Sequence, residues 1–258
     1  MTLRERVNNG DAVIGSWINT ASPIVAEIMA AAGFDFLAVD AEHASIDIAA
    51  AQAIFQAIAA ANPDCAPMVR LPGNDYAVTK RYLDAGAAGI IVPFVNSADD
   101  AREAVRAAKY PPVGDRGLGF GRAQAYGFDV DAYLARANEE TLVCVQIEHI
   151  DAVRNIDDIL SVPNIDAAFI GPYDLTASMG IAAQFDHPDY AQARAEIMAA
   201  CSRHGVAPGI HVVPPEPDGV ARRLDDGFRF IAYSLDITML GTVCRDGLAS
   251  IRSQIKET

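Results

Sequence analysis

Short apolar runs alternate with longer amphipathic passages from one end of the chain to the other. Eight of these runs consist almost entirely of apolar residues, as is typical of strands that are buried on both faces of a parallel sheet. We predict strands at Val13–Ile18, Phe36–Asp40, Pro67–Leu71, Gly89–Pro93, Leu142–Glu148, Ala167–Gly171, Ala207–Val212 and Phe230–Ser234.

The passages between these runs have the sequence signals of helix ends. Ser22 followed by Pro23 predicts an N-cap and a first helical residue, and Gly33 predicts the end of that helix. Asp47 and Ser97 predict two further N-caps. Eight strands that alternate with helices predict a (β/α)₈ TIM barrel of the α/β class, formed as a single domain over residues 1–258.

One interval, between Pro93 and Leu142, is longer than a single helical connection requires. It contains a segment rich in glycine and proline at residues 111–122, followed by a second helix around Val130–Asn138. The glycines of this segment do not have the spacing of a dinucleotide-binding fingerprint, and no strand leads into them. A packed surface loop and a loop that covers the active site are both consistent with the sequence.

Composition and charge narrow the choice of partners. The chain has 258 residues, of which 51% are apolar, and a net charge of −14 with a pI near 4.6, which argues against nucleic acid or an anionic membrane. The four cysteines are widely separated and favour free thiols. The N-terminus has no apolar signal region, so we expect a cytoplasmic protein.

Two carboxylates end consecutive predicted strands. Glu148 and Asp174 are 26 positions apart (174 − 148), which is the length of one strand–helix–strand step. The carboxyl ends of parallel strands meet at one rim of the barrel, so we expect these side chains to be neighbours. Hard cations such as Mg²⁺ or Mn²⁺ commonly use one or two protein carboxylates. The pair therefore predicts a divalent metal site, and an ion pair between Glu148 and Arg154 is the alternative.

Three further residues at strand ends have chemistry of interest. Asp40 and His43 are three positions apart, which is consistent with a carboxylate that orients a general acid/base imidazole, or with a capping aspartate beside a solvated histidine. Arg70 ends an apolar strand, where a guanidinium inside a barrel mouth would bind an oxyanion.

Other residues at the rim are weaker candidates. Trp17, the only tryptophan, and Gln146 lie on strands that lead to the rim. Trp17 is either a substrate contact or a core residue, and His211 on the seventh strand is a weak candidate. We interpret the remaining histidines at 149, 187 and 204 as structural or solvent-facing. The only lysines are Lys80, Lys109 and Lys256, and none of them ends a predicted strand, so a Schiff-base mechanism lacks its nucleophile.

Several of these segments, in this order, resemble the HpcH/HpaI aldolase family of metal-dependent class II pyruvate aldolases. The segments that carry the resemblance are Phe34-Asp-Phe-Leu-Ala-Val-Asp-Ala-Glu-His43, Met68-Val-Arg70, Gly86-Ala-Ala-Gly-Ile-Ile-Val-Pro93, Gln146-Ile-Glu148 and Ile170-Gly-Pro-Tyr-Asp-Leu175. The resemblance runs from about Gly15 to Ser234. Tyr173 stands where many relatives have a smaller residue, which affects the shape of the pocket rather than the metal ligands.

The resemblance implies a set of roles for these residues. Glu148 and Asp174 would hold Mg²⁺, Mn²⁺ or Co²⁺, and pyruvate would chelate this ion. Arg70, with Gln146 nearby, would stabilise the enolate oxygen, and His43, oriented by Asp40, would take part in proton transfer. Backbone N–H groups around Tyr173 and Asp174 would receive the carboxylate.

The leading hypothesis is therefore an aldolase that reversibly cleaves 4-hydroxy-2-keto acids to pyruvate, or hydroxypyruvate, and an aldehyde. A malyl-CoA or citramalyl-CoA type of lyase is the second hypothesis, and a non-catalytic oligomeric barrel is the third. The small keto acid and aldehyde are the expected partners. The resemblance also implies a homo-oligomer, a hexamer built as a trimer of dimers, in which the C-terminal helix from about Asp236 is exchanged between subunits.

Overall fold

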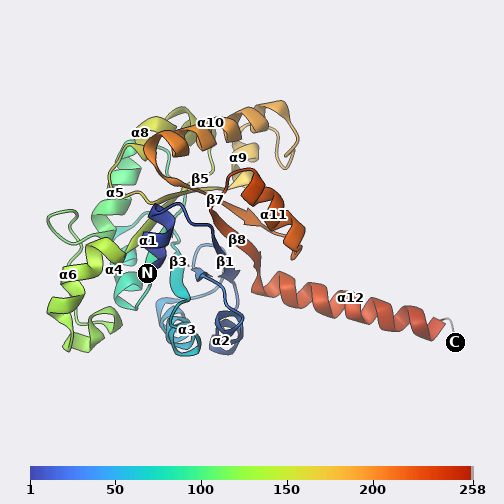
Figure 1. Ribbon diagram of the computed structural model, residues 1–258, viewed down its shortest axis with the longest axis horizontal. Helices are drawn as coiled ribbons and strands as arrows, with labels where there is room; N and C mark the ends of the chain where they lie inside the picture. Colours follow the sequence, from blue (N-terminus) through green and yellow to red (C-terminus); the bar gives the residue numbers. More distant parts are fainter. Residues whose placement is uncertain (257–258) are drawn as a thin grey trace.

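A computed structural model describes residues 1–256 and contains eight parallel strands that close into one barrel, in which β1 pairs with both β2 and β8 (Figure 1). The strands are β1 (Val13–Ile18), β2 (Phe36–Asp40), β3 (Ala66–Arg70), β4 (Gly89–Val92), β5 (Leu142–Ile147), β6 (Ala167–Ile170), β7 (Ala207–Val212) and β8 (Phe230–Leu235). The predicted (β/α)₈ fold is confirmed, and the predicted strand ends agree with the structure to within one residue.

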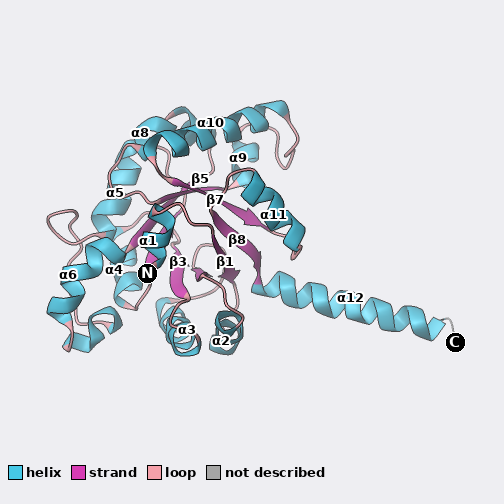
Figure 2. Ribbon diagram, viewed as in Figure 1, coloured by secondary structure: helices cyan, strands magenta, loops and turns pink. Residues whose placement is uncertain are grey.

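Helices surround the barrel and connect its strands (Figure 2). They are α1 (Leu3–Asn8), α2 (Pro23–Ala31), α3 (Ile48–Ala61), α4 (Tyr76–Asp84), α5 (Ala98–Ala108), the 3₁₀ helix η1 (Arg122–Gly127), α6 (Val130–Glu140), α7 (Ile150–Arg154), α8 (Ile156–Leu160), α9 (Pro172–Ser178), α10 (Pro188–His204), α11 (Pro217–Asp225) and α12 (Asp236–Lys256). The side chains of Ser22, Asp47 and Ser97 accept from the N–H three residues further on, so the three predicted N-caps are confirmed.

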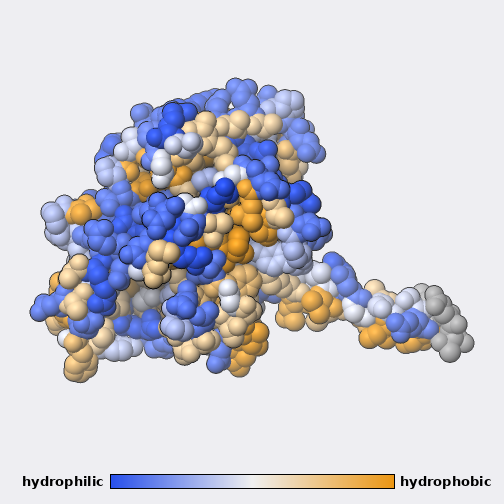
Figure 3. Space-filling model, in the orientation of Figure 1, coloured by the Kyte–Doolittle hydropathy of each residue, from blue (hydrophilic) through white to orange (hydrophobic). Residues whose placement is uncertain are grey.

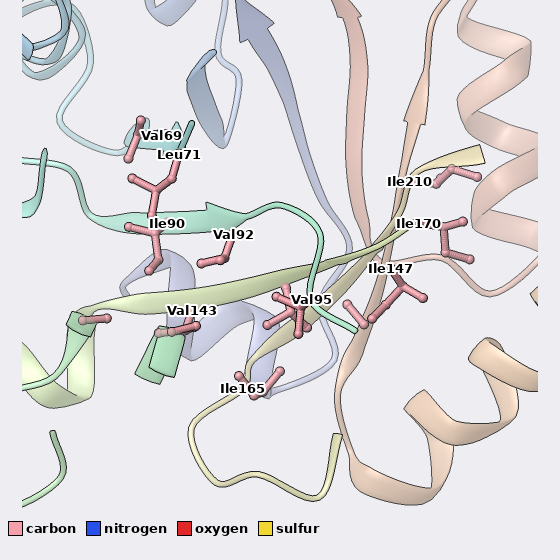
Figure 4. Close-up of a cluster of buried hydrophobic side chains, with 14 of the residues drawn as sticks. Val69, Leu71, Ile90, Val92, Val95, Val143, Ile147, Ile165, Ile170 and Ile210 are labelled. Carbon is pink, nitrogen blue, oxygen red and sulfur yellow. The ribbon is translucent and has the colours of Figure 1, made fainter. Parts of the chain in front are cut away.

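The strands divide the core into two layers. Side chains that point outward pack against the helices, and Figure 4 shows part of this outer layer, with Val69, Ile90 and Val143 among its members. Side chains that point inward fill the barrel, where Phe36 and Phe230 stack with their ring centroids 4.4 Å apart. Because side chains alternate along a strand, each strand contributes to both layers, which explains the nearly continuous apolar runs in the sequence.

Helix α1, which we did not predict, contributes to the N-terminal end of the barrel. Its residues Leu3 and Val7 belong to the inner apolar cluster. Between them, Arg4 donates from Nε to Asp166 Oδ1 over 2.8 Å, and both of these side chains are buried. The buried charge of Arg4 is thus paired, as a charge in the interior must be to avoid a large desolvation cost.

The segment rich in glycine and proline packs at the same end of the barrel. Arg116, whose side chain is fully buried, donates to Asp84, the last residue of α4, over 2.8 Å and to the hydroxyl of Tyr133 on α6 over 3.0 Å. Asp84 precedes β4, so this anchor lies toward the N-terminal ends of the strands. Of the two interpretations, the described chain therefore supports a packed surface loop rather than a cover for the C-terminal rim.

Helix α12 extends away from the barrel (Figure 1). Its apolar side chains Leu240, Val243, Ile251 and Ile255 are exposed, with 73% of Val243 accessible, and apolar patches are visible along the helix in Figure 3. Within residues 1–256, none of the helices combines the length and the apolar character needed to cross a bilayer.

Candidate functional site

The alternation of side chains along the strands brings the predicted site residues together. Five of the predicted residues lie an even number of positions from a residue of the inner apolar layer on the same strand, namely Trp17, Asp40, Arg70, Gln146 and His211. They therefore point inward, and each lies near the carboxyl end of its strand. The mouth of the barrel at this end collects them in one place, as the fold requires of an active site.

Asp40, which is buried, forms an ion pair with the partly buried Arg70 at this mouth. Arg70 donates from Nε to Oδ1 of Asp40 over 3.0 Å and from Nη2 to Oδ2 over 2.7 Å, across the paired strands β2 and β3. Burial alone would raise the pKa of Asp40, but the hydrogen bonds and charge of Arg70, with N–H groups from His43 and Asn19, outweigh it and lower the pKa. Asp40 is therefore a fixed anion that orients the guanidinium.

The predicted orientation of His43 by Asp40 is wrong in one respect. Asp40 Oδ1 accepts from the backbone N–H of His43 over 3.2 Å, and not from its ring. The ring instead has Nε2 3.5 Å from Oε2 of Glu42, and 63% of its side chain is exposed at the rim. The reason is that the inward phase of β2 commits the Asp40 carboxylate to Arg70, while His43 lies beyond the strand in the following turn.

Glu148 is held at the end of β5 by its neighbours. Its Oε1 accepts from the backbone N–H of Phe94 over 2.7 Å, and its Oε2 accepts from the side-chain amide of Gln146. Phe94 reaches this position with a left-handed φ of 57°, a strained conformation for a residue other than glycine. A Cβ on Gly171 would lie 2.7 Å from the Cβ of Glu148, so only glycine permits this close approach.

Three carboxylates, from Glu42, Glu148 and Asp174, influence one another at the mouth. Burial raises the pKa of Glu148, and the negative charges of Glu42 and Asp174 add to this rise, against hydrogen bonds from Phe94 and Gln146 that lower it. Burial also raises the pKa of Glu42, although Arg70 and His43 lower it. The raised pKa values of Glu42 and Glu148 show that the negative charge here is only partly compensated, and a cation would stabilise it.

The donor atoms at this position fit a hard divalent cation. Besides the carboxylates of Glu148 and Asp174, Oε1 of Gln146 is buried and lacks a hydrogen-bond partner among the described residues. All of these donors are oxygens, which Mg²⁺ and Mn²⁺ prefer. Residues 1–256 contain no group of three or more His, Cys, Asp or Glu side chains placed to hold a metal ion, so most coordination positions of a cation bound here would be filled by water or substrate oxygens.

The alternative interpretation of Glu148 is not supported. Arg154 pairs with Asp151 on its own helix, with Arg154 Nη1 2.7 Å from Oδ1. The other histidines interpreted as structural have such roles: His149 and His187 cap α7 and α10, and His204 lies 2.9 Å from Asp157.

Aromatic residues form one wall of the mouth. The guanidinium carbon of Arg70 lies 4.5 Å from the ring centroid of Trp17, and the rings of Phe169 and His211 meet Trp17 edge to face at 5.7 and 5.9 Å. His211 places Nε2 3.1 Å from the carbonyl of Ser234, and burial lowers its pKa to about 4, so its ring is neutral at pH 7. Trp17 Nε1 is buried and lacks a hydrogen-bond partner among the described residues, so it can donate to a bound ligand.

Tyr173 and Asp174 open helix α9 directly after β6. Tyr173 is exposed at the rim, where its ring meets that of Phe185 at 4.9 Å. Lys80 and Lys109, the two lysines whose side chains the structure describes, lie elsewhere. Lys80 stacks over Tyr76 on α4, and Lys109 donates to backbone carbonyls of α6 and the residue that follows it.

Sequence reasoning missed three residues of this site. Glu42 approaches both Arg70, at 3.3 Å from Nε, and His43, and its position in the motif that ends β2 could have indicated it. Asn19 donates to Asp40 over 2.9 Å, and Phe94 donates its backbone N–H to Glu148. No sequence signal indicates these two contacts, because they depend on how neighbouring strands are aligned.

Comparison with known proteins points to one family of enzymes. The model of the family described as HpcH/HpaI aldolase/citrate lyase matches residues 13–241. A hydroxypyruvate/pyruvate aldolase from Roseobacter denitrificans is 38% identical over 240 residues, which cover 93% of this chain and 92% of that protein. A 4-hydroxy-2-oxo-heptane-1,7-dioate aldolase from Escherichia coli is 40% identical over 241 residues, 93% of this chain and 90% of that protein.

A solved structure gives the same result for the fold. The crystal structure of an HpcH/HpaI aldolase/citrate lyase family protein from Burkholderia cenocepacia superposes with a TM-score of 0.92 at 36% identity, covering 97% of this chain and 98% of that chain. The similarity therefore extends over the whole barrel and includes every strand that contributes to the site.

Proposed function

The chain belongs to the HpcH/HpaI aldolase/citrate lyase family and is a carbon–carbon lyase of the aldolase type, and from this premise we propose that it cleaves 4-hydroxy-2-keto acids reversibly to pyruvate and an aldehyde. We include hydroxypyruvate as an alternative keto acid, because relatives at 36–39% identity are named for both keto acids. The curated relatives with about 40% identity are aldolases, which favours this reaction over a CoA-ester lyase and over a non-catalytic barrel.

The observation that carries the proposal is the juxtaposition of the carboxylate cluster with the oriented guanidinium of Arg70. Glu148 and Asp174 would hold a divalent cation, with the amide oxygen of Gln146 nearby. When bound there, Mg²⁺, Mn²⁺ or Co²⁺ supplies positive charge next to the keto and carboxylate oxygens of pyruvate. Cleavage of the C3–C4 bond leaves an enolate, which forms only where negative charge on oxygen is stabilised.

Arg70 is placed to stabilise this charge. Two of its five N–H groups bind Asp40, and three remain for the enolate oxygen. The face of Trp17 at 4.5 Å and the fixed anion of Asp40 hold the guanidinium plane in one orientation, so little reorganisation is needed during the reaction. The backbone N–H groups that open α9 at Tyr173 and Asp174 would receive the carboxylate of the keto acid.

His43 is the proposed acid and base. Cleavage transfers the proton of the C4 hydroxyl to a base while the C3–C4 electron pair moves to the enolate, and the imidazole at the rim accepts that proton. Glu42, whose Oε2 lies 3.5 Å from Nε2, replaces Asp40 as the carboxylate that orients this ring. Addition of pyruvate to an aldehyde uses the same groups in reverse.

Metal dependence tests the proposal. Release of pyruvate from a 4-hydroxy-2-keto acid, followed with a coupled dehydrogenase, should stop after exhaustive chelation and return when MgCl₂, MnCl₂ or CoCl₂ is added. Borohydride in the presence of pyruvate should give no covalent adduct. Pyruvate release that survives chelation, or a stable borohydride adduct, would overturn the proposal.

We also propose that a second copy of the chain covers α12. The apolar residues Leu240, Val243 and Ile251 are exposed along a helix that extends away from its own barrel. An apolar surface of this kind is typical of an interface. Exchange of this helix between subunits would cover it, within a hexamer built as a trimer of dimers. Sedimentation equilibrium should then report an oligomer, and a monomer at micromolar concentration would contradict the assembly.

A further inference from the structure

A hydrogen-bond relay connects the start of α12 to the guanidinium of Arg70. Its central residue is Asn19, which follows β1 by one position and continues the inward phase of Trp17. Asn19 donates from Nδ2 to Oδ2 of Asp40 over 2.9 Å, and this same oxygen accepts from Nη2 of Arg70 over 2.7 Å. Asn19 and Arg70 therefore hold one carboxylate oxygen from two sides.

The other oxygen of Asp40 is equally committed. Oδ1 accepts from Nε of Arg70 over 3.0 Å and from the backbone N–H groups of Glu42 and His43 over 3.2 Å each. Asn19 is thus the only side chain besides Arg70 in the described chain that donates to Asp40. Without the Asn19 donor, Oδ2 would be held by Arg70 alone, and the plane of the carboxylate would be fixed only through the backbone N–H groups at Oδ1.

Asn19 is itself fixed by the first residue of α12. The carboxylate of Asp236, which is 5% exposed, accepts from the backbone N–H of Asn19 over 3.0 Å at Oδ1. At Oδ2 it accepts from the backbone N–H of Thr20 over 2.9 Å and from the Thr20 hydroxyl over 2.6 Å. The backbone N–H groups of Asn19 and Thr20 therefore tie the loop after β1 to the junction of β8 and α12 and place Asn19 beside Asp40, and Thr20→Val keeps both of these bonds.

From this arrangement we propose that Asn19 is a positioning residue for the aldol reaction, which acts through Asp40 to hold Arg70 at the enolate oxygen. The inference rests on the proposed function, because it assigns Arg70 to that oxygen. A misplacement of about 1 Å at such a group costs on the order of 10²-fold in rate. The alternative is that Asn19 only stabilises the loop after β1.

Asn19→Ala tests the proposal, and Thr20→Val is its matched control. Each variant removes one side-chain hydrogen bond from the same loop, but only Asn19→Ala removes a contact to Asp40. We expect Asn19→Ala to lower kcat by about 10- to 100-fold, with KM for the keto acid changed less than about threefold. Thr20→Val should keep kcat within about twofold of the wild type.

The fluorescence of Trp17 provides a second readout. It is the only tryptophan of the chain, and Arg70 lies 4.5 Å from its ring. The emission should change in Asn19→Ala and not in Thr20→Val, because only the first variant releases Arg70. If Asn19→Ala does not fold, Asn19→Asp keeps the size of the side chain and replaces the donor with an acceptor, and it should change kcat and emission in the same direction.

Two results would overturn the inference. One is an unchanged kcat and emission in Asn19→Ala, and the other is an equal loss of kcat in Asn19→Ala and Thr20→Val, which would show a structural role alone. Failure of the aldolase proposal would look different, because the wild type itself would release no pyruvate. The emission of Trp17 would then still report whether Asn19 controls the position of Arg70.

Discussion

Replacement of Glu148 with glutamine should change the stability of the protein in opposite directions with and without metal. The carboxyl is buried beside two other carboxylates, so its pKa is raised. A raised pKa means that the folded chain holds this proton more tightly than the unfolded chain. Stability therefore falls as the pH rises through the interval between the two pKa values, and at pH 8 the ionised group is a cost.

Glutamine removes this cost and keeps most of the local hydrogen bonds. Its amide oxygen can accept from the N–H of Phe94, and its NH₂ group can donate to Oε1 of Gln146, which has no hydrogen-bond partner among the described residues. Relief of a functional strain of this kind commonly adds about 1 kcal/mol to the free energy of unfolding. In EDTA, we therefore expect Glu148→Gln to be more stable than the wild type by about 1 kcal/mol.

Metal should reverse the order. At a metal concentration of about 100 times Kd, binding stabilises the wild type by ~2.7 kcal/mol. If the substitution weakens binding by about 100-fold, the same concentration stabilises the variant by only ~0.4 kcal/mol. The difference of ~2.3 kcal/mol exceeds the gain of about 1 kcal/mol, so the variant becomes the less stable protein by roughly 1 kcal/mol.

Urea denaturation at pH 8, with EDTA or with MnCl₂, measures both differences. Glu139→Gln is the control, because it makes the same chemical change at a side chain that is 86% exposed. MnCl₂ should stabilise this control variant as much as it stabilises the wild type. The reasoning would be refuted if Glu148→Gln were destabilised in EDTA, or if MnCl₂ stabilised it as much as the wild type.

Three further predictions address other parts of the structure. Arg70→Lys keeps the charge but loses the two-point contact to Asp40, so kcat/KM for pyruvate release should fall by about 10²- to 10³-fold. A fall of kcat/KM by less than about tenfold would contradict the role of the guanidinium. Gly171→Ala places a Cβ 2.7 Å from that of Glu148, so thermal unfolding should show that the free energy of unfolding falls by about 1–3 kcal/mol. Calorimetry should show a weaker affinity for Mn²⁺. An unchanged free energy of unfolding and an unchanged affinity would show that the backbone adapts. Burial lowers the pKa of Lys109 to about 8. In urea denaturation, the stability of the wild type relative to Lys109→Met should therefore rise by on the order of 2 kcal/mol between pH 7.5 and 9.5. A stability difference that does not change with pH would mean that Lys109 has an ordinary pKa.

The fold could be predicted from the sequence because each strand carries its own signal. Apolar runs such as Phe36–Asp40 and Ala207–Val212 end where the strands end, and Ser22, Asp47 and Ser97 mark helix starts with their side chains. These signals are local, so one sequence is enough to detect them. The short helix α1 was missed because six residues carry too little periodicity to distinguish a helix from a loop.

The positions of the candidate residues at strand ends could be predicted, but their contacts only in part. The sequence placed Asp40, Arg70 and Glu148 at strand ends, and the structure brings them to one mouth. The partner of Asp40 was wrongly predicted, because proximity in sequence favoured the His43 ring, whereas the register of β2 and β3 places Arg70 directly opposite. Contacts that cross between strands depend on this register and on closure of the barrel, which no local pattern specifies.

The most direct test of the account is the position of a bound metal ion. Crystals grown with MnCl₂ and pyruvate, measured at a wavelength where manganese scatters anomalously, should show one peak within coordination distance of the carboxylates of Glu148 and Asp174 and of two oxygens of pyruvate. An anomalous peak elsewhere, or no peak beside these carboxylates while pyruvate occupies the mouth, would contradict the central claim.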